Sequence, residues 1–302
     1  MSLLESVSGL AVRYLKRERL LALRAGYYSV RTQLYPVMRA VYGTFDAAGL
    51  RDHLERRIGT DFEILMVHSS INHMKPMYTG TPLDLVRMLI SFCAPDRTLV
   101  MPAFYFGDPE IGGAYATFKQ RPRFDLRKTP SMMGLATELF RRSPGVVQSR
   151  HPVYRMSALG PLAKQLTDGH ERAGTPSGRG TPFEFMASHN TRIIGIGKPF
   201  QVMTQAHHVE ELMGDEFPVP GRYGMPLSMT LVDGKEEVPF ELVPGRSLEW
   251  RYNIWKLRTI MDRDRLQEWN FHHVPMFAAR AGEVTAALID AAKRGVTLYD
   301  KP

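Results

Sequence analysis

Apolar runs alternate with amphipathic stretches along most of this chain. Residues 63–68 form a nearly continuous apolar run, which is typical of a strand buried on both faces. A helical pattern follows over 83–92, after the start signal Thr81-Pro82, and a second apolar run over 98–102 ends at a proline. Strand, helix and strand at this length predict a βαβ unit, and therefore an α/β fold.

The same patterns continue toward the C-terminus. Residues 103–128 predict a long aromatic loop of the kind that often binds ligands. Asp233-Gly234 lies between two apolar runs and predicts a hairpin. Ser131 and Thr204 are each predicted to cap a helix. The remaining predicted elements are strands at 153–159 and 192–196, and helices at 47–58 (capped by Thr44 or Asp46), 131–142, 182–187, 205–213, 248–265 and 284–293.

The first 45 residues differ from the rest in charge. Residues 3–42 predict two helices that break near Gly26, with an apolar stripe beside basic side chains. Residues 1–45 hold seven basic and two acidic side chains, which is more than half of the net charge of +8. Packing on the main domain or on a second subunit is favoured over contact with a membrane surface, because the stripe is not rich in Trp or Phe. We therefore expect a basic helical extension over 1–45 and a single domain over 46–302.

Composition narrows the class of protein. Of the 302 residues 44% are hydrophobic and 23% charged, the balance of a folded protein. Cys93 is the single cysteine and is expected in the core, which excludes an intrachain disulfide and fits a reducing compartment. The sequence shows no signal peptide and no long apolar run, so we expect a cytoplasmic protein. An anionic cofactor or substrate explains the remaining positive charge as well as nucleic acid does. Because no basic run interleaved with aromatics resembles a base-stacking platform, we expect no nucleic-acid partner.

The predicted helix 205–213 carries the best candidate for chemistry. His207 and Glu210 lie three residues apart and therefore share one face of a helix. A carboxylate on one imidazole nitrogen fixes the tautomer and leaves the other nitrogen as a base. His208 and Glu211 repeat this spacing, so spacing alone does not choose between the two histidines. On spacing alone, a solvated helix with charge pairs on its surface is the favoured explanation, because such pairs are common on helices.

Polar motifs follow several predicted strands or begin helices. They are His68-Ser69-Ser70, the turn that contains Ser131, His151-Pro152, and the helix of His207. In α/β folds, binding sites collect at the carboxyl ends of the strands, so these motifs are expected to meet there. The signatures of dinucleotide-binding folds, P-loops and hydrolase nucleophile elbows are absent from the sequence.

In their order along the chain, these motifs resemble the aminoglycoside 3-N-acetyltransferase family. The resemblance covers roughly residues 60–215. The motifs that carry it are His68-Ser69-Ser70, a strand ending at Pro102 before an aromatic residue, Thr129 to Gly134, Ser149-x-His151-Pro152, Thr181-Pro182, and Thr204-x-x-His207-x-x-Glu210. The resemblance implies an α/β/α sandwich around a mixed central sheet. It also implies N-acetyl transfer from acetyl-CoA to an amine, with no metal.

The resemblance also implies roles for individual residues. His207 and Glu210 match the catalytic pair, and His151 matches a histidine that faces the acceptor; a turn histidine fixed by a backbone hydrogen bond explains His151 equally well. Backbone N–H groups near Ser70 are candidate donors to the thioester oxygen. The residues expected to hold the coenzyme are His68, Ser69, Ser70, Ser131, Met132, Met133, Gly134 and Thr204.

Two other functions and several details stay open at this level. A metal-dependent hydrolase would use His207, Glu210, His68 and His151 as zinc ligands. A non-catalytic coenzyme A-binding protein would use the basic helices as its working surface. For the acyltransferase, an amino sugar or an aminoglycoside is the expected acceptor, with the acidic residues of 210–216 as its candidate partners. A homo-oligomer is compatible with the sequence.

Overall fold

The computed structural model describes residues 32–302. The chain divides into two units, residues 1–44 and 45–302. In the first unit the structure describes helix α3 (Tyr35–Tyr42), which has a proline in its first turn and ends at Gly43 with a positive φ of 72°. The helices predicted before residue 32 lie outside the described residues. The assignment of an N-terminal extension and one acyltransferase domain stays a prediction.

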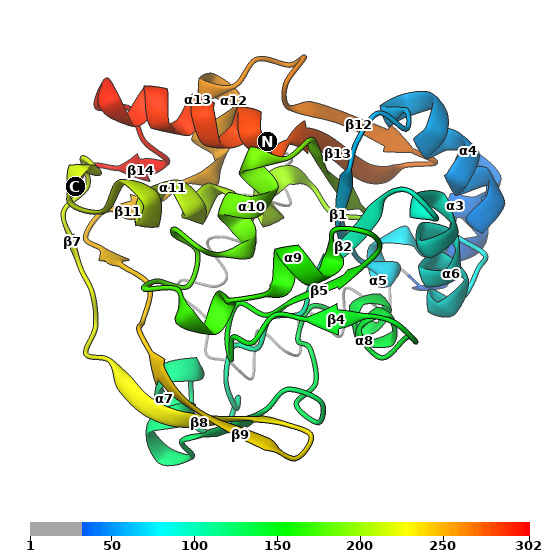
Figure 1. The fold of residues 1–302 in the computed structure, drawn as a ribbon. Coiled ribbons are helices and arrows are strands. Elements are labelled where there is room, and N and C mark those ends of the chain that lie inside the picture. The colour runs from blue at the N-terminus through cyan, green and yellow to red at the C-terminus, as the bar shows by residue number, and fades with distance from the viewer. Residues whose placement is uncertain (1–31) are drawn as a thin grey trace. The chain divides into compact units, whose positions relative to one another are not determined.

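A seven-stranded mixed sheet forms the centre of the second unit (Figure 1). Strand β1 (Ile64–Ser69) is parallel to both β2 (Thr98–Pro102) and β6 (Thr191–Ile196). The other strands are antiparallel to their neighbours: β4 (Val147–Gln148), β5 (Met156–Leu159), β12 (Gln267–Phe271) and β13 (Val274–Arg280), in the order β12-β13-β6-β1-β2-β5-β4. The predicted βαβ unit is confirmed, since helix α6 (Pro82–Cys93) connects β1 to β2.

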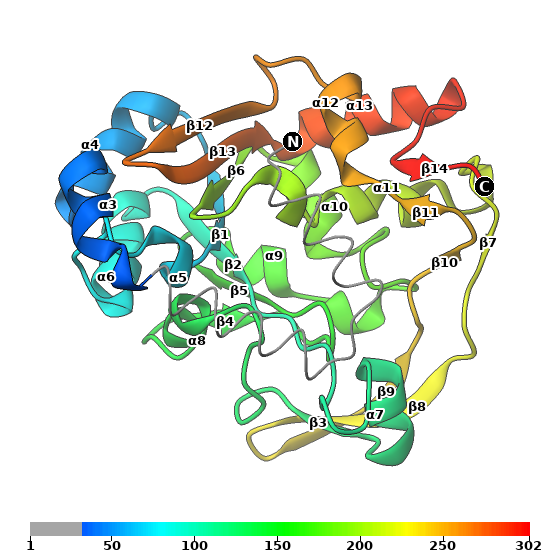
Figure 2. The ribbon, with the colours of Figure 1, turned by 180° about the vertical axis from the view of Figure 1, so that it is seen from behind.

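Two groups of helices flank the sheet, as Figures 1 and 2 show. The first group is α4 (Ala47–Ile58), α6 and α8 (Leu135–Arg141). The second group is α9 (Ala163–Thr167), α10 (Pro182–Ser188), α11 (Ala206–Met213) and α13 (Ala281–Lys293). This arrangement confirms the predicted α/β/α sandwich around a mixed sheet.

Local capping explains where two of these helices begin and corrects two predictions. The Asp46 side chain accepts the Gly49 N–H at 2.8 Å, and Thr81 forms a reciprocal capping box with Asp84. Ser131 does not cap a helix, because α8 begins only after Gly134, whose φ of 106° ends the preceding turn. Thr204 is not a cap either, since α11 begins one residue later than its position requires.

A smaller sheet, β3 (Arg123–Asp125), β8 (Leu227–Asp233) and β9 (Glu236–Leu242), forms a lobe with helix α7 (Ala114–Gln120) (Figure 1). The hairpin predicted at Asp233-Gly234 is confirmed by the pairing of β8 with β9. The lobe has its own apolar core, which includes Phe118, Phe124 and Leu231. The segment 103–128 is therefore less irregular than predicted, because burial of these side chains orders α7 and β3.

The helix predicted over 248–265 is wrong in most of its length. The segment forms β10 (Ser247–Leu248), β11 (Arg251–Tyr252), a 3-10 turn η4 (Ile254–Lys256) and the single helical turn α12 (Leu257–Ile260). Strand β10 pairs with β7 (Gly221–Arg222), and β11 pairs with β14 (Tyr299–Asp300). Both partners are distant in the sequence, so long-range pairing has overridden the local helical pattern.

Two further predictions from the sequence concern Cys93 and membrane-spanning helices. Cys93 is buried in the core, and burial raises the pKa of its thiol to about 12, so the group is an inert core residue. Within residues 32–302, no helix is long and apolar enough to cross a lipid bilayer.

Candidate active site

His207 and Glu210 contact each other on α11, as their spacing predicts. His207 Nδ1 lies 3.3 Å from Glu210 Oε1 and 3.2 Å from Oε2. The side chain of His207 is 36% exposed, whereas that of Glu210 is only 9% exposed. Since a carboxylate only accepts hydrogen bonds, Nδ1 carries the proton that it donates to Glu210. Nε2 is then the nitrogen left to take a proton from a substrate.

The carboxylate makes His207 a stronger base than an isolated imidazole. Burial lowers the pKa of His207, but the hydrogen bond and negative charge of Glu210, with the charge of Glu211, outweigh burial. The pKa of His207 therefore lies above the ordinary value of 6.5. A base with a pKa near the working pH suits proton transfer.

The neighbouring histidine is structural. His208 is buried, and its Nδ1 donates a hydrogen bond to the Ser177 carbonyl oxygen at 2.6 Å. Burial is the main cause that lowers the pKa of His208. Glu211 has a different partner, the Arg246 backbone N–H at 2.8 Å from its Oε1. Of the two histidines, His207 is the more accessible one, and its role as the base stays a prediction.

Two tyrosines that sequence reasoning missed complete the surroundings of the pair. The Tyr299 hydroxyl donates a hydrogen bond to Glu210 Oε1 at 2.6 Å. The Tyr252 ring lies 5.2 Å from the His207 ring, measured between centroids. Tyr299 is 89 residues from Glu210, and its strand is two residues long, so no sequence pattern marked it.

Four of the residues expected to hold the coenzyme line one cavity of about 150 Å³. They are His68 and Ser69 at the end of β1 and Met132 and Met133 in the turn before α8. The remaining lining residues are Val67, Pro102, Thr137, Lys198 and Val202. Among the described residues that line this cavity, Lys198 alone carries a formal charge at neutral pH. The chain segment 198–207 then leads from the cavity to the His207 helix.

His68 is the unusual member of this lining. It is 3% exposed, and within residues 32–302 neither of its ring nitrogens has a hydrogen-bond partner. Burial, followed by the charge of Lys198, lowers the pKa of His68 to about 4, so the ring is neutral near pH 7. A buried polar group without a partner costs free energy. The ring is therefore set to exchange a hydrogen bond with a polar group that enters the cavity.

Ser70 does not have the role expected of its backbone. The Ser70 N–H donates to the Ile196 carbonyl oxygen at 2.9 Å, within the β1–β6 junction. The Ser70 N–H itself is thus unavailable to a thioester oxygen, and a donor among the neighbouring backbone N–H groups stays a prediction. The strand register at the end of β1 explains this, because it continues the parallel ladder by one bond.

The turn before α8 is held by its own side chains. Ser131 Oγ accepts the Met133 N–H at 3.1 Å, and the Ser131 N–H donates to Glu138 Oε2 at 2.8 Å. Gly134 is exposed and has a positive φ that other residues rarely adopt. Thr204 lies near His207, and its carbonyl oxygen accepts the His207 N–H at 3.1 Å. Within residues 32–302, no group bonds the buried Thr204 hydroxyl.

His151 lies buried in a turn and stacks on His170, with ring centroids 4.7 Å apart. Its Nδ1 accepts the backbone N–H groups of Val153 at 3.1 Å and Tyr154 at 2.8 Å. Burial, with the proximity of His170, holds the pKa of His151 well below its ordinary value. Nε2 therefore carries the proton of a neutral ring, and His151 offers a donor rather than a base.

The metal alternative finds no ligand set. Within residues 32–302, no three His, Cys, Asp or Glu side chains are arranged to hold a metal ion. The four residues named for a zinc site are divided between the cavity of His68, the turn of His151 and helix α11.

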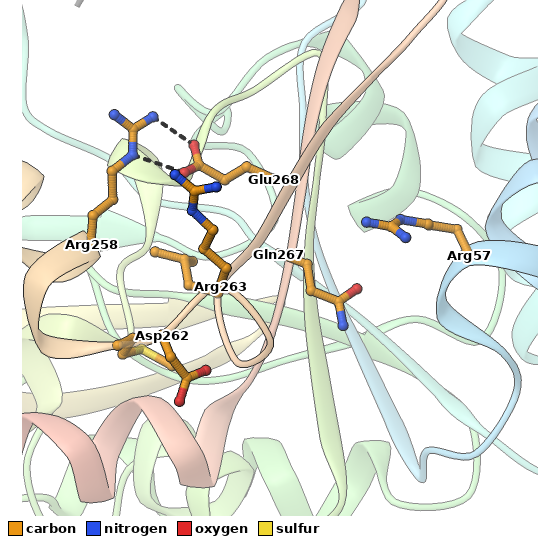
Figure 3. A pocket seen from close by; sticks show the side chains of 8 residues that line it. Arg57, Arg258, Asp262, Arg263, Gln267 and Glu268 are labelled. Carbon is orange, nitrogen blue, oxygen red and sulfur yellow. Dashed lines mark hydrogen bonds and ion pairs between the residues drawn. The ribbon is translucent and has the colours of Figure 1, made fainter.

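A larger groove of about 560 Å³ opens beside α4, α12 and β12 (Figure 3). Arg258 Nε and a terminal nitrogen donate to the Glu268 carboxylate at 2.8 and 2.9 Å, and Arg57 lies over the Trp269 ring at 4.8 Å. The other lining residues are Met261, Asp262, Arg263, Leu266 and Gln267. The groove mixes both charges and contains none of the residues singled out from the sequence.

Comparisons with known proteins show the family of this chain. A family model described as aminoglycoside 3-N-acetyltransferase matches residues 66–292. Aminoglycoside N(3)-acetyltransferase III of Serratia marcescens is 28% identical over 188 residues, which cover 60% of this chain and 68% of that protein. Alignments with the next such enzymes span 62–64% of their length.

Solved structures show the same fold. The crystal structure of the aminoglycoside acetyltransferase AAC(3)-Xa has a TM-score of 0.70 at 20% identity, and covers 88% of this chain and 99% of its own. A sisomicin-bound structure of AAC-VIa has a TM-score of 0.68 at 22% identity, covering 84% and 99%. A structure of AAC-IIIb with coenzyme A has a TM-score of 0.66 at 16% identity, covering 85% and 100%.

Proposed function

The chain belongs to the aminoglycoside 3-N-acetyltransferase family, and we propose that it transfers the acetyl group of acetyl-CoA to a primary amine of an aminoglycoside or a related amino sugar. Two observations carry this proposal: the His207–Glu210 contact, and a cavity lined by four of the residues that the family resemblance assigns to the coenzyme. The single buried thiol, Cys93, fits the proposed cytoplasmic location.

The cavity of His68 suits the acyl donor. Its lining combines apolar side chains with a few polar groups, as sites for small molecules usually do. The unpartnered imidazole of His68 can bond an amide or carbonyl of the coenzyme arm. Lys198 supplies a positive charge for the phosphates of the coenzyme. In the proposed complex, acetyl-CoA binds in this cavity and extends along residues 198–207 toward His207.

Proton transfer is the role of His207. An amine near pH 7 is mostly protonated, and it must lose a proton before or during attack. The ammonium releases one proton to solvent, and His207 Nε2 takes a second proton from the neutral amine nitrogen as this nitrogen forms a bond to the thioester carbonyl carbon. The carbon–sulfur bond then breaks, and the coenzyme leaves as a thiolate that recovers the proton from His207. The charge of Glu210 stabilises the imidazolium between these two steps.

The acceptor is proposed from charge and family. Relatives are named as aminoglycoside N(3)-acetyltransferases, and aminoglycosides are polycations that favour acidic surroundings. Glu211 on the helix of His207 supplies a carboxylate, and so do the exposed Asp215 and Glu216 in the 3-10 turn that follows this helix. His151 offers a neutral N–H donor for a hydroxyl or carbonyl of the acceptor, in place of the catalytic role expected from the sequence.

An acetyl-transfer assay tests this proposal. The full chain is incubated with acetyl-CoA and a panel that includes sisomicin, gentamicin and simple amino sugars, and products are identified by mass spectrometry. The expected result is a single acetyl group added to an acceptor amine. Stabilisation by coenzyme A in a thermal shift assay, without product from any amine, would instead support a binding protein and overturn the proposal.

A further inference from the structure

A two-stranded ribbon from the C-terminal part of the chain carries one tyrosine on each strand. In the pairing of β11 with β14, Tyr252 lies directly opposite Tyr299. Residues that face each other in an antiparallel pair project to the same side. The two rings accordingly contact each other, with centroids 5.2 Å apart. Tyr252 reaches the ring of His207 and Tyr299 reaches the carboxylate of Glu210, so one ribbon contacts both members of the pair.

The contact of Tyr299 with Glu210 is the shorter of the two that hold this carboxylate. The Tyr299 hydroxyl oxygen lies 2.6 Å from Oε1, whereas His207 Nδ1 lies 3.2 and 3.3 Å from the two oxygens. Short hydrogen bonds to an ionised acceptor are the stronger ones. Burial, followed by the charge of Glu210, raises the pKa of Tyr299, so its hydroxyl stays protonated and can only donate here. The tyrosine thus fixes where the carboxylate lies.

Tyr299 itself is held firmly. Its backbone N–H donates to Thr297 Oγ1 at 3.2 Å, and Lys256 Nζ donates to its carbonyl oxygen at 2.6 Å. The space between Tyr299, Glu210 and α13 is a cavity of only about 10 Å³. That is about the smallest volume that holds one water molecule, so the Tyr299 ring has little room to move.

We infer that Tyr299 is a positioning residue for acyl transfer, which holds the Glu210 carboxylate beneath His207 so that the imidazole keeps its tautomer and its orientation. The inference rests on the proposed function of His207 as the base. It adds a residue beyond the part of the chain, 66–292, that the family model matches. Without the hydroxyl, the Glu210 side chain can rotate about its own bonds, and its hold on His207 weakens.

The variant Tyr299→Phe tests this inference, because it removes the hydroxyl and keeps the ring that packs on Phe217 and Tyr252. We expect kcat to fall about 10-fold, the size of one hydrogen bond to a charged group, with KM for acetyl-CoA unchanged. We also expect the acid limb of the pH–rate profile to move to lower pH, because Glu210 no longer raises the pKa of His207 in full.

NMR titration of histidine-labelled protein separates this inference from the proposed function. The His207 resonance is identified by its loss in His207→Ala, and its pKa is measured in unmodified protein and in Tyr299→Phe. A lower pKa in the variant supports the inference even if no acceptor amine is ever found. An unchanged or higher pKa overturns it, whereas absence of acetyl transfer by the unmodified protein overturns the proposed function alone.

Tyr78→Phe is a matched control for the loss of a buried hydroxyl. Tyr78 is fully buried between α5 (Ile71–Met74) and α6, and its hydroxyl donates to the Thr81 carbonyl oxygen at 3.2 Å. This variant is expected to lose stability as Tyr299→Phe does, but to keep the pH–rate profile of the unmodified protein. The same pH shift in both variants would contradict a specific role for Tyr299.

Discussion

Tyr299 and Glu210 are 89 residues apart in the sequence, yet the hydroxyl of Tyr299 lies 2.6 Å from Glu210 Oε1. The proposed catalytic pair therefore depends on two regions of the chain. Helix α11 supplies both His207 and Glu210, and Tyr299 on the C-terminal strand β14 donates a hydrogen bond to the Glu210 carboxylate. In the proposed site, β14 thereby orders His207 through the Glu210 carboxylate.

The pH dependence of activity should show how far the Glu210 carboxylate raises the pKa of His207. Since Glu210 raises the pKa of His207 and the base must be neutral, kcat/KM is expected to fall as pH drops below a pKa that lies above 6.5. In Glu210→Gln this acid limb should move to lower pH, with a lower plateau rate. Full pH–rate profiles of both proteins measure this. A limb that stays in place would mean that another group titrates there.

His208 should affect stability rather than chemistry. His208→Ala removes the donor to the buried Ser177 carbonyl oxygen, which is expected to cost about 1–3 kcal/mol of unfolding free energy. His208→Asn can donate from its side-chain amide and should recover part of that loss. Chemical denaturation and activity assays of both variants measure the two effects. Loss of turnover in folded His208→Asn would assign chemistry to this histidine after all.

Replacing His68 should weaken coenzyme binding without lowering the stability of the ligand-free protein. His68→Leu removes a buried imidazole whose ring nitrogens lack partners within residues 32–302, so the ligand-free protein is expected to be as stable as the unmodified chain or more stable. The variant should bind acetyl-CoA more weakly. Thermal shift measurements with and without acetyl-CoA give both quantities. A less stable variant that binds acetyl-CoA normally would show that His68 serves the core instead.

The same residue predicts a pH window for stability. The pKa of His68 is about 4 in the folded protein and 6.5 in an unfolded chain, so folding favours the neutral ring. Above pH 6.5 the ring is neutral in both states and does not affect the free energy of unfolding. This free energy falls as pH drops from 6.5 toward 4, because only the unfolded chain binds the proton there. The stability gained by His68→Leu should therefore grow over this range, which denaturation at several pH values measures.

Lys198 should act on binding of the acyl donor. Replacing it in Lys198→Met removes the positive charge from the cavity and is expected to raise KM for acetyl-CoA about 10-fold, the loss of one charge-assisted contact. The turnover rate at saturating acetyl-CoA should change little. Steady-state kinetics at two salt concentrations measure this. An unchanged KM would place the phosphates elsewhere.

Much of the fold follows from local sequence patterns. Strands β1, β2 and β6 are continuous apolar runs, and Thr81 and Asp46 mark the starts of α6 and α4 through their side chains. His207 and Glu210 meet because a helix brings residues three apart onto one face. Local rules of this kind need no knowledge of the rest of the chain.

Features that depend on distant partners could not be predicted in this way. The 248–265 segment has helical character in the sequence, but β10 and β11 pair with strands 25 or more residues away. Tyr299 contacts Glu210 only after β14 has paired with β11. The free imidazole of His68 and the occupied N–H of Ser70 likewise follow from the register of β1 beside β6, which no single segment encodes.

The most direct test of the central claim is the acetyl-transfer rate of His207→Ala against that of the unmodified chain, with both proteins shown to be folded and to bind acetyl-CoA. Folding is checked because loss of the His207 N–H leaves the nearly buried Glu210 carboxylate with one donor fewer, which is expected to cost some stability. We expect turnover to fall by about 10²–10⁴-fold, the usual size of a lost general base. Full turnover in the folded variant would contradict His207 as the base.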